Sequence, residues 1–130
     1  MIPLSFIIVD DRELDCFIAE KLIEKADKNS LVKCFYEANS CLEYIKNNEV
    51  STETIILLDI MMPVMTGFDF LEVFERLEWE KKKWYKIVPI TTSLNKSEIQ
   101  RISTYPSVLK VLQKPYSVDA LKHIIELATS

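Results

Sequence analysis

The chain has 130 residues, with 16 basic and 20 acidic side chains and a formal net charge of −4 at pH 7. This length fits one domain that buries about two thirds of its unfolded surface. The mildly acidic balance argues against a general nucleic-acid binder, which would carry a basic surplus or stripe. The apolar run Ile2 to Val9 lacks the basic flank of a signal peptide and the length of a membrane span, so we expect a cytoplasmic protein.

Strand and helix patterns alternate along the chain. Apolar runs predict strands, and apolar residues three to four positions apart predict amphipathic helices. The strands are expected at Leu4–Val9, Leu31–Tyr36, Thr54–Leu58, Lys86–Thr92 and Val108–Leu112. The helices are expected from Arg12 to about Ala26, from a cap at Asn39 or Ser40 to about Asn47, from a cap at Thr66 through Leu77 into Glu78–Trp84, at Ser97–Ile102, and after a cap at Ser117.

Two local features qualify this pattern. Pro89 lies inside the fourth strand, where it indicates irregular pairing or a position that needs no N–H donor. The lysine-rich run Glu78–Trp84 is most simply a solvated helix end, because lysines complement the helix dipole there. A partner-binding use of Trp79 and Trp84 stays open.

Five strands alternating with five helices predict right-handed crossovers and a parallel sheet with helices on both faces. No linker, repeat or low-complexity segment interrupts the alternation. We therefore expect one α/β domain over residues 1–130, with a doubly wound sheet in the strand order 2-1-3-4-5.

The cysteines and the histidine point to no site of their own. Cys16, Cys34 and Cys41 are odd in number and show no paired two-residue spacing, which argues against a metal cluster or a disulfide framework. We interpret them as small buried hydrophobes. The single histidine, His123, lies in the last helical stretch and is interpreted as a surface or hydrogen-bonded residue.

The segment from Ile55 to Gly67 organises the rest of the chain. Four apolar residues run directly into Asp59, and a turn with Pro63 follows before the only glycine of the sequence, Gly67. An unbroken apolar run is typical of a strand covered on both faces. Asp59 is then expected at the carboxyl edge of the sheet, where open α/β sheets bind their ligands.

Polar residues also follow the other strands. Asp10 and Asp11 follow the first, a threonine pair ends the fourth, and Lys114 follows the fifth. In the order 2-1-3-4-5 the first and third strands are neighbours, so three carboxylates converge. Like charges ~4 Å apart repel by about 4 kcal/mol at an effective dielectric of about 20, so a cation is needed.

The hard oxygen ligands of this group favour Mg²⁺. With the ammonium of Lys114 and the hydroxyl of Thr91, the group suits phosphoryl transfer onto Asp59. Each residue also has a plainer interpretation. Asp10 and Asp11 could cap the first helix, Thr91 could be an ordinary strand residue, and Lys114 could be solvated.

At these residues the sequence resembles the receiver domain of bacterial two-component response regulators, over essentially its whole length. The matching motifs are Ile-Val-Asp10-Asp11, Leu-Leu-Asp59-Ile-Met-Met-Pro63 with Gly67, Pro-Ile-Thr91-Thr-Ser and Gln-Lys114-Pro115. Each motif is weak by itself, but the set is specific in this order. The resemblance implies a flavodoxin-like fold.

The resemblance also implies the roles of the site residues. Asp59 would be the phosphoacceptor, and a histidine kinase or histidine phosphotransfer protein would be the donor. Asp11, Asp59 and the backbone carbonyl of Met61 would bind Mg²⁺ directly, and Asp10 would bind it through water. Lys114 would pair with the phosphoryl oxygens, and the peptide bond between Lys114 and the proline that follows it would be cis. Thr91 would move toward the phosphoryl group and shift an equilibrium between inactive and active forms.

The sequence departs from the family pattern at three positions. Val111 stands where a tyrosine or phenylalanine is usual, and Thr92 stands where a smaller residue is usual. Met61, two residues after the phosphoacceptor, is apolar and cannot position water. We therefore expect slower dephosphorylation than with a polar residue at that position.

The sequence argues against two other functions and leaves a third as an alternative. A flavin or nucleotide module would need a glycine- or hydroxyl-rich loop after the first strand, where this chain has two aspartates. A phosphate-ester hydrolase would need a second acid near Asp59, which is followed by Ile, Met and Met. A receiver-like interaction module that is not phosphorylated stays as the alternative.

The resemblance implies a signalling protein rather than an enzyme with a separate substrate, because it catalyses only its own phosphorylation and dephosphorylation. Its partners would be the phosphohistidine donor and an unknown downstream protein, with no direct nucleic-acid or membrane contact. The chain is expected to be a monomer or a phosphorylation-dependent dimer. It is either a freestanding receiver or a fragment of a longer protein, and receivers commonly signal through the fourth helix, fifth strand and fifth helix.

Overall fold

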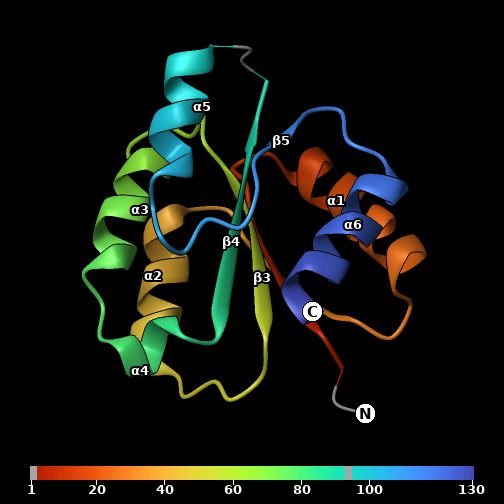
Figure 1. The fold of residues 1–130 in the computed structure, drawn as a ribbon, viewed down its shortest axis with the longest axis horizontal. Coiled ribbons are helices and arrows are strands. Elements are labelled where there is room, and N and C mark those ends of the chain that lie inside the picture. Colours follow the sequence, from red (N-terminus) through yellow and green to blue (C-terminus); the bar gives the residue numbers. More distant parts are fainter. Residues whose placement is uncertain (1–2, 93–94) are drawn as a thin grey trace.

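The computed structural model describes residues 3–92 and 95–130. Ile2 of the opening apolar run, and Ser93 of the motif after Thr92, lie outside the described residues. Five parallel strands form one sheet in the order β2-β1-β3-β4-β5, which confirms the expected topology (Figure 1). The strands are β1 (Ser5–Val9), β2 (Leu31–Phe35), β3 (Thr54–Asp59), β4 (Tyr85–Thr91) and β5 (Leu112–Gln113).

Helices cover both faces of the sheet. Figure 1 shows α1 and α6 on one side of the strands and α2, α3 and α5 on the other. The helices of the described residues are α1 (Glu13–Ala26), α2 (Ala38–Asn47), α3 (Gly67–Glu75), α4 (Trp79–Lys82), α5 (Lys96–Ser103) and α6 (Val118–Thr129). The caps expected at Thr66 and Ser117 are confirmed, because their hydroxyls accept the amides of Asp69 and Ala120 at 3.3 and 3.1 Å. The cap expected at Asn39 or Ser40 is wrong, since α2 begins after Glu37.

The chain has six helices among its described residues instead of the expected five, because α3 does not run into Glu78–Trp84. It ends at Glu75, and the short helix α4 follows. The Lys82 ammonium of α4 turns back to the Glu75 carbonyl oxygen at 3.0 Å. The Glu75 carboxylate also accepts the amide and hydroxyl of Ser107 at 2.9 and 3.0 Å. These contacts occupy the carbonyl and the carboxylate of Glu75 at the point where the helix ends, although the local sequence favours its continuation.

The fifth strand is shorter than expected and begins later. The chain forms an isolated bridge between Ile87 and Val108, and regular pairing resumes only where Ile90 faces Leu112. Between these two points β4 spans one residue fewer than its neighbour. The interruption lies beside Pro89, which has no N–H to donate to a ladder. The irregular pairing expected at Pro89 is confirmed.

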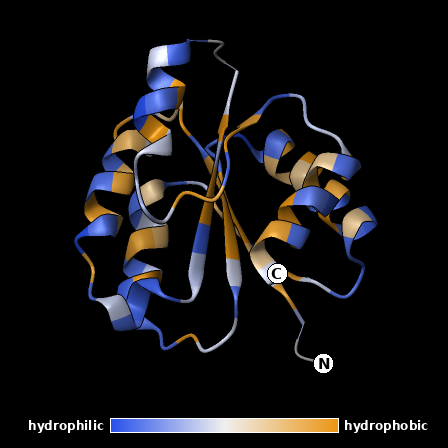
Figure 2. Ribbon diagram, in the orientation of Figure 1, coloured by the Kyte–Doolittle hydropathy of each residue, from blue (hydrophilic) through white to orange (hydrophobic). Residues whose placement is uncertain are grey.

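Two hydrophobic clusters lie on opposite faces of the sheet. One packs α2, α3 and α5 against the strands, and the other packs α1 and α6 against them. All six residues of β3 are buried, which confirms that both faces of this strand are covered. Figure 2 shows the corresponding apolar stripes on the helices turned toward the sheet.

The cysteines behave as expected. Cys16 and Cys41 are buried, Cys34 is half-buried, and all three are free thiols. Burial raises the pKa of Cys16 and Cys41 to about 12, so both thiols are neutral at physiological pH. His123 lies exposed on α6. Within residues 3–92 and 95–130, no helix combines the length and the apolar character needed to cross a membrane.

Candidate functional site

Three carboxylates meet at the carboxyl edge of the sheet. Asp10 follows β1, Asp11 begins the turn to α1, and Asp59 is the last residue of β3. Their ligand oxygens lie within 4.8 Å of one another. Asp10 and Asp59 are only 4% and 7% exposed, whereas Asp11 is exposed. The convergence follows from the strand order, because β1 and β3 pair directly.

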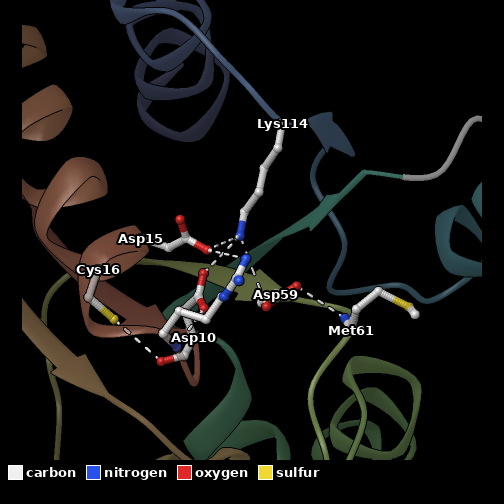
Figure 3. Close-up of polar contacts among 7 residues, drawn as sticks. Asp10, Asp15, Cys16, Asp59, Met61 and Lys114 are labelled. Atoms are coloured by element: carbon white, nitrogen blue, oxygen red, sulfur yellow. Dashed lines mark hydrogen bonds and ion pairs between the residues drawn. The ribbon is translucent and has the colours of Figure 1, made fainter.

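Asp59 is an acid in an unfavourable environment. Burial raises the pKa of its carboxyl to about 6, the Met61 amide and the Lys114 ammonium oppose this rise, and the charges of Asp10 and Asp11 add to it. Its Oδ1 accepts the Met61 amide at 3.0 Å, and its Oδ2 lies 4.0 Å from the Lys114 ammonium (Figure 3). Asp59 therefore remains mostly ionised above neutral pH at a considerable cost.

Lys114 extends into the acidic group from the loop between β5 and α6. Its ammonium lies 2.9 Å from Asp10 Oδ2 and 3.2 Å from Asp15 Oδ2 (Figure 3). Burial lowers the pKa of Lys114, but its hydrogen bond to Asp10 and the charges of Asp59 and Asp10 outweigh burial and raise the pKa above its usual value. Lys114 therefore stays charged. The Lys114–Pro115 peptide bond is cis, as the resemblance implied.

The threonine pair lies at the end of β4. Thr91 is buried, and its carbonyl oxygen accepts the Lys114 amide at 2.8 Å, which ties the ends of β4 and β5 together. Thr92 is exposed and lines a cavity of about 340 Å³ that Asp15, Asp59 and Lys114 also line. The two threonines thus occupy different environments.

Asp15 is the residue that sequence reasoning missed. It lies in the first turn of α1, four residues after Asp11, and its carboxylate contacts Lys114. Asp11 precedes the N-cap Arg12, so the four-residue spacing does not place the two acids on one face of the helix. The sequence therefore carries no signal for this contact, which depends on how the loop before α6 packs beside α1.

The loop from β3 to α3 has two local specialisations. Val64 has a φ of 67°, which is rare for a β-branched residue, and it is fully exposed. Gly67 approaches the end of β3 so closely that a Cβ there would lie 2.7 Å from the Cα of Ile60. The glycine therefore serves close packing.

The donor set suits a divalent cation. Hard carboxylate oxygens from two adjacent strand ends are the ligands that Mg²⁺ takes in proteins, usually together with several waters. The structure also shows part of a helix-capping role for Asp10. Asp10 Oδ1 accepts the Arg12 amide at 3.0 Å, just before α1. Its Oδ2 is nevertheless directed at Lys114, so Asp10 belongs to the charged group.

The fold and the site define a doubly wound α/β protein with an acidic, lysine-containing pocket at the carboxyl edge of its sheet. The family model of the response regulator receiver domain matches residues 6–126. The chain belongs to this family.

Two curated relatives are sensor proteins of greater length. The chain is 29% identical over 124 residues to the autoinducer 1 sensor kinase/phosphatase LuxN of Vibrio campbellii, covering 93% of this chain and 13% of LuxN. It is 28% identical over 123 residues to the aerobic respiration control sensor protein ArcB of Escherichia coli, covering 95% of this chain and 15% of ArcB. The chain thus spans a small part of each relative.

Solved structures share the fold over nearly the whole chain. A response regulator receiver protein from Dyadobacter fermentans has a TM-score of 0.85 at 27% identity, covering 96% of this chain and 97% of its own. A two-component response regulator from Cytophaga hutchinsonii has a TM-score of 0.86 at 17% identity, covering 98% of both chains, and shows the fold alone.

Proposed function

We propose that this receiver domain accepts a phosphoryl group on Asp59 from a phosphohistidine of a histidine kinase or histidine phosphotransfer protein, in a Mg²⁺-dependent reaction. The observation that supports this function best is the convergence of three carboxylates with the Lys114 ammonium 4.0 Å from Asp59. A purely structural role gives no reason to bury two of these acids together.

In the proposed reaction an Asp59 carboxylate oxygen forms a bond to phosphorus while the phosphorus–nitrogen bond of the donor breaks. The departing imidazole takes a proton from water. Burial makes the Asp59 carboxylate a stronger nucleophile, because a poorly solvated negative charge is stabilised more by forming the bond to phosphorus than a hydrated charge is. When bound, Mg²⁺ neutralises charge on the phosphoryl oxygens.

The other residues hold and read the phosphoryl group. Asp11, Asp59 and the Met61 carbonyl would bind the ion directly, and Asp10 would bind it through water. Lys114 would donate to a phosphoryl oxygen. Thr91 would do the same from the end of β4, which would pull the following loop inward.

We assign the output to the surface of α5, β5 and α6, which correspond to the fourth helix, fifth strand and fifth helix of the family pattern because α4 is additional. Val111 lies half-buried against the core beside this surface, where the family usually has an aromatic residue. A downstream protein, or a second copy after phosphorylation, would bind there.

Acetyl phosphate with Mg²⁺, followed by intact-mass measurement, tests the proposal. The wild-type chain should gain one phosphoryl group and no more, and Asp59→Asn should gain none. Asp119→Asn removes an exposed acid of α6 and serves as the control that keeps labelling. An unlabelled wild-type chain, tested also with a phosphohistidine donor, would favour the non-phosphorylated interaction module.

The lifetime of the phosphorylated form tests Met61. Its side chain is 67% exposed beside Asp59 and apolar, so it offers nothing to orient an attacking water. Met61→Asn is expected to shorten the lifetime several-fold, measured as loss of the phosphoryl mass after removal of the donor. Met61→Leu should keep the wild-type lifetime; an equal shortening in both variants would contradict the explanation.

A further inference from the structure

We propose that Asp15 is a positioning residue that holds the Lys114 ammonium beside α1, so that Asp15 and a phosphoryl group on Asp59 compete for the same lysine. This inference rests on the proposed function. It concerns a residue outside the expected site, and it predicts opposite effects on cation binding and phosphoryl binding.

The Lys114 ammonium lies closer to Asp10 and Asp15 than to Asp59. Lys114 Nζ lies 2.9 Å from Asp10 and 3.2 Å from Asp15, but 4.0 Å from Asp59. Figure 3 shows the Asp15 carboxylate on the α1 side of the ammonium, away from the Met61 end of the Asp59 carboxylate. An ammonium has three N–H donors, and two of them are engaged on this side. To serve an oxygen bound to Asp59, the ammonium must move away from Asp15.

Asp15 is well placed to retain the ammonium. It lies in the first turn of a 14-residue helix, and its side chain is 24% exposed, so solvent screens the ion pair only in part. Arg12 Nη1 is 4.0 Å from the same oxygen, but the Arg12 side chain is 76% exposed and adds little. The contact with Lys114 is therefore the dominant one for Asp15.

Removing the Asp15 charge should have two consequences. The ammonium becomes freer to approach Asp59, so the site binds a phosphoryl group more tightly. Without that group, the ammonium is shared more closely by Asp10 and Asp59, where it competes with a divalent cation. Mg²⁺ affinity should therefore fall. A residue that merely supports the fold would not raise one affinity while lowering the other.

Asp15→Asn tests the inference, because it keeps the shape of the side chain and removes its charge. Mg²⁺ affinity is measured by calorimetry on the otherwise metal-free full chain. Phosphoryl affinity is measured with beryllofluoride, a tetrahedral anion that mimics the phosphoryl group, at saturating Mg²⁺. We expect beryllofluoride to bind about three- to tenfold more tightly and Mg²⁺ about three- to tenfold more weakly, as for one partly screened ion pair.

Matched variants separate this role from simpler ones. Glu13→Gln removes an acid from the same turn, but Glu13 lines a different cavity with Phe17 and Cys34 and should change neither affinity. Asp15→Glu keeps the charge and should stay near wild type. Asp15→Ser provides a second neutral variant if Asp15→Asn melts at a lower temperature. In a Lys114→Met background, Asp15→Asn should lose its effect on beryllofluoride binding.

The result that overturns the inference is an Asp15→Asn chain whose two affinities are unchanged or move in the same direction, or whose gain persists without Lys114. If the wild-type chain binds beryllofluoride normally and only Asp15→Asn behaves this way, the proposed function stands and the role of Asp15 falls. If the wild-type chain neither binds beryllofluoride nor becomes labelled, both fall.

Discussion

Asp59 carries a negative charge where solvent hardly reaches it. The free-energy cost of burying this charge dominates the behaviour of the site at the scale of single residues. Burial raises the pKa of Asp59 to about 6 from an ordinary value of 3.8. The folded, metal-free chain therefore holds the Asp59 proton more tightly than the unfolded chain does. The stability that this proton contributes is complete below about pH 4 and is lost as the pH rises through about 6.

Asp59→Asn should accordingly stabilise the metal-free chain. Asparagine keeps an oxygen for the Met61 amide and removes the buried charge. We expect the free energy of unfolding to rise by about 1–3 kcal/mol near pH 7.5 and by much less near pH 4, because the wild-type carboxyl is then protonated. Urea unfolding with a chelator at both pH values measures the difference. An equal gain at both would show that charge is not the cause.

Val64 offers a second test at this scale. A left-handed conformation costs about 1–2 kcal/mol for an ordinary L-residue, and asparagine tolerates it best after glycine. Val64 is fully exposed, so replacement removes no core packing. Val64→Asn should raise the free energy of unfolding by about 0.5–1 kcal/mol, measured by urea unfolding. Val64→Ala, which keeps a Cβ but loses the branch, should gain less; the reverse order would contradict strain as the reason.

Among the site residues, those at the strand ends could be predicted and the helical one could not. Asp10, Asp11, Asp59 and Lys114 each follow a strand pattern, and the strand order then brings them together. Asp15 lies within a helix pattern, where an acid near the N-terminus is ordinary. Only the packing of α1 beside the Lys114 loop reveals its contact.

At the scale of elements, the junction between β3 and α3 fixes the position of Asp59. The Gly67 amide donates to the Ile60 carbonyl at 3.0 Å, and Thr66 with Asp69 forms a reciprocal cap at the start of α3. This arrangement lets the helix begin directly against the residue that follows Asp59.

Gly67→Ala should damage both stability and the site. The added methyl would meet backbone, at 2.7 Å from Ile60 Cα and 3.1 Å from the Asp59 carbonyl oxygen, so the end of β3 must shift. We expect a loss of about 2 kcal/mol or more in urea unfolding, together with weaker Mg²⁺ binding in calorimetry. Thr66→Ala, in the same turn, should cost about 1 kcal/mol through the lost cap and leave Mg²⁺ binding intact. Equal Mg²⁺ affinity in Gly67→Ala would refute the effect on the site.

The elements that differ from expectation are those set by contacts between distant segments. The lysines and tryptophans of Glu78–Trp84 favour a continued helix locally. In the structure, however, the carbonyl and carboxylate of Glu75 accept hydrogen bonds from Lys82 and Ser107. The apolar run Val108–Leu112 favours a strand, but its neighbour carries Pro89. Hydrophobic periodicity shows neither constraint, because Ser107 lies 32 residues from Glu75 and Pro89 belongs to a different strand from the run that it affects.

For the whole molecule, cation binding and folding should be linked. The three acids come from two elements that are adjacent only in the folded chain, so the unfolded chain has no comparable site. A ligand that binds only the folded state stabilises it by about 2.7 kcal/mol at a hundredfold excess over its Kd.

Mg²⁺ should therefore raise the free energy of unfolding by about this amount at that excess, and a chelator should reverse the gain. Urea unfolding across a Mg²⁺ titration measures it. Asp11→Asn should lose most of the stabilisation, since Asp11 is one of the proposed direct ligands. Asp119→Asn should retain it. Equal stabilisation of all three chains would indicate a nonspecific salt effect.

The interrupted pairing beside Pro89 has a mechanical consequence for the molecule. Between the Ile87 bridge and the renewed pairing at Ile90, β4 and the segment before β5 form no regular ladder pairs, and two residues of β4 face three of the neighbouring segment. Above this stretch, Thr91 is tied to Lys114; below it, Glu75 anchors Ser107. With no ladder pairs within this stretch, a displacement of Thr91 and Lys114 needs to break no β4–β5 ladder pair before it reaches the Ile87 bridge, and the pairing of β3 with β4 is not involved.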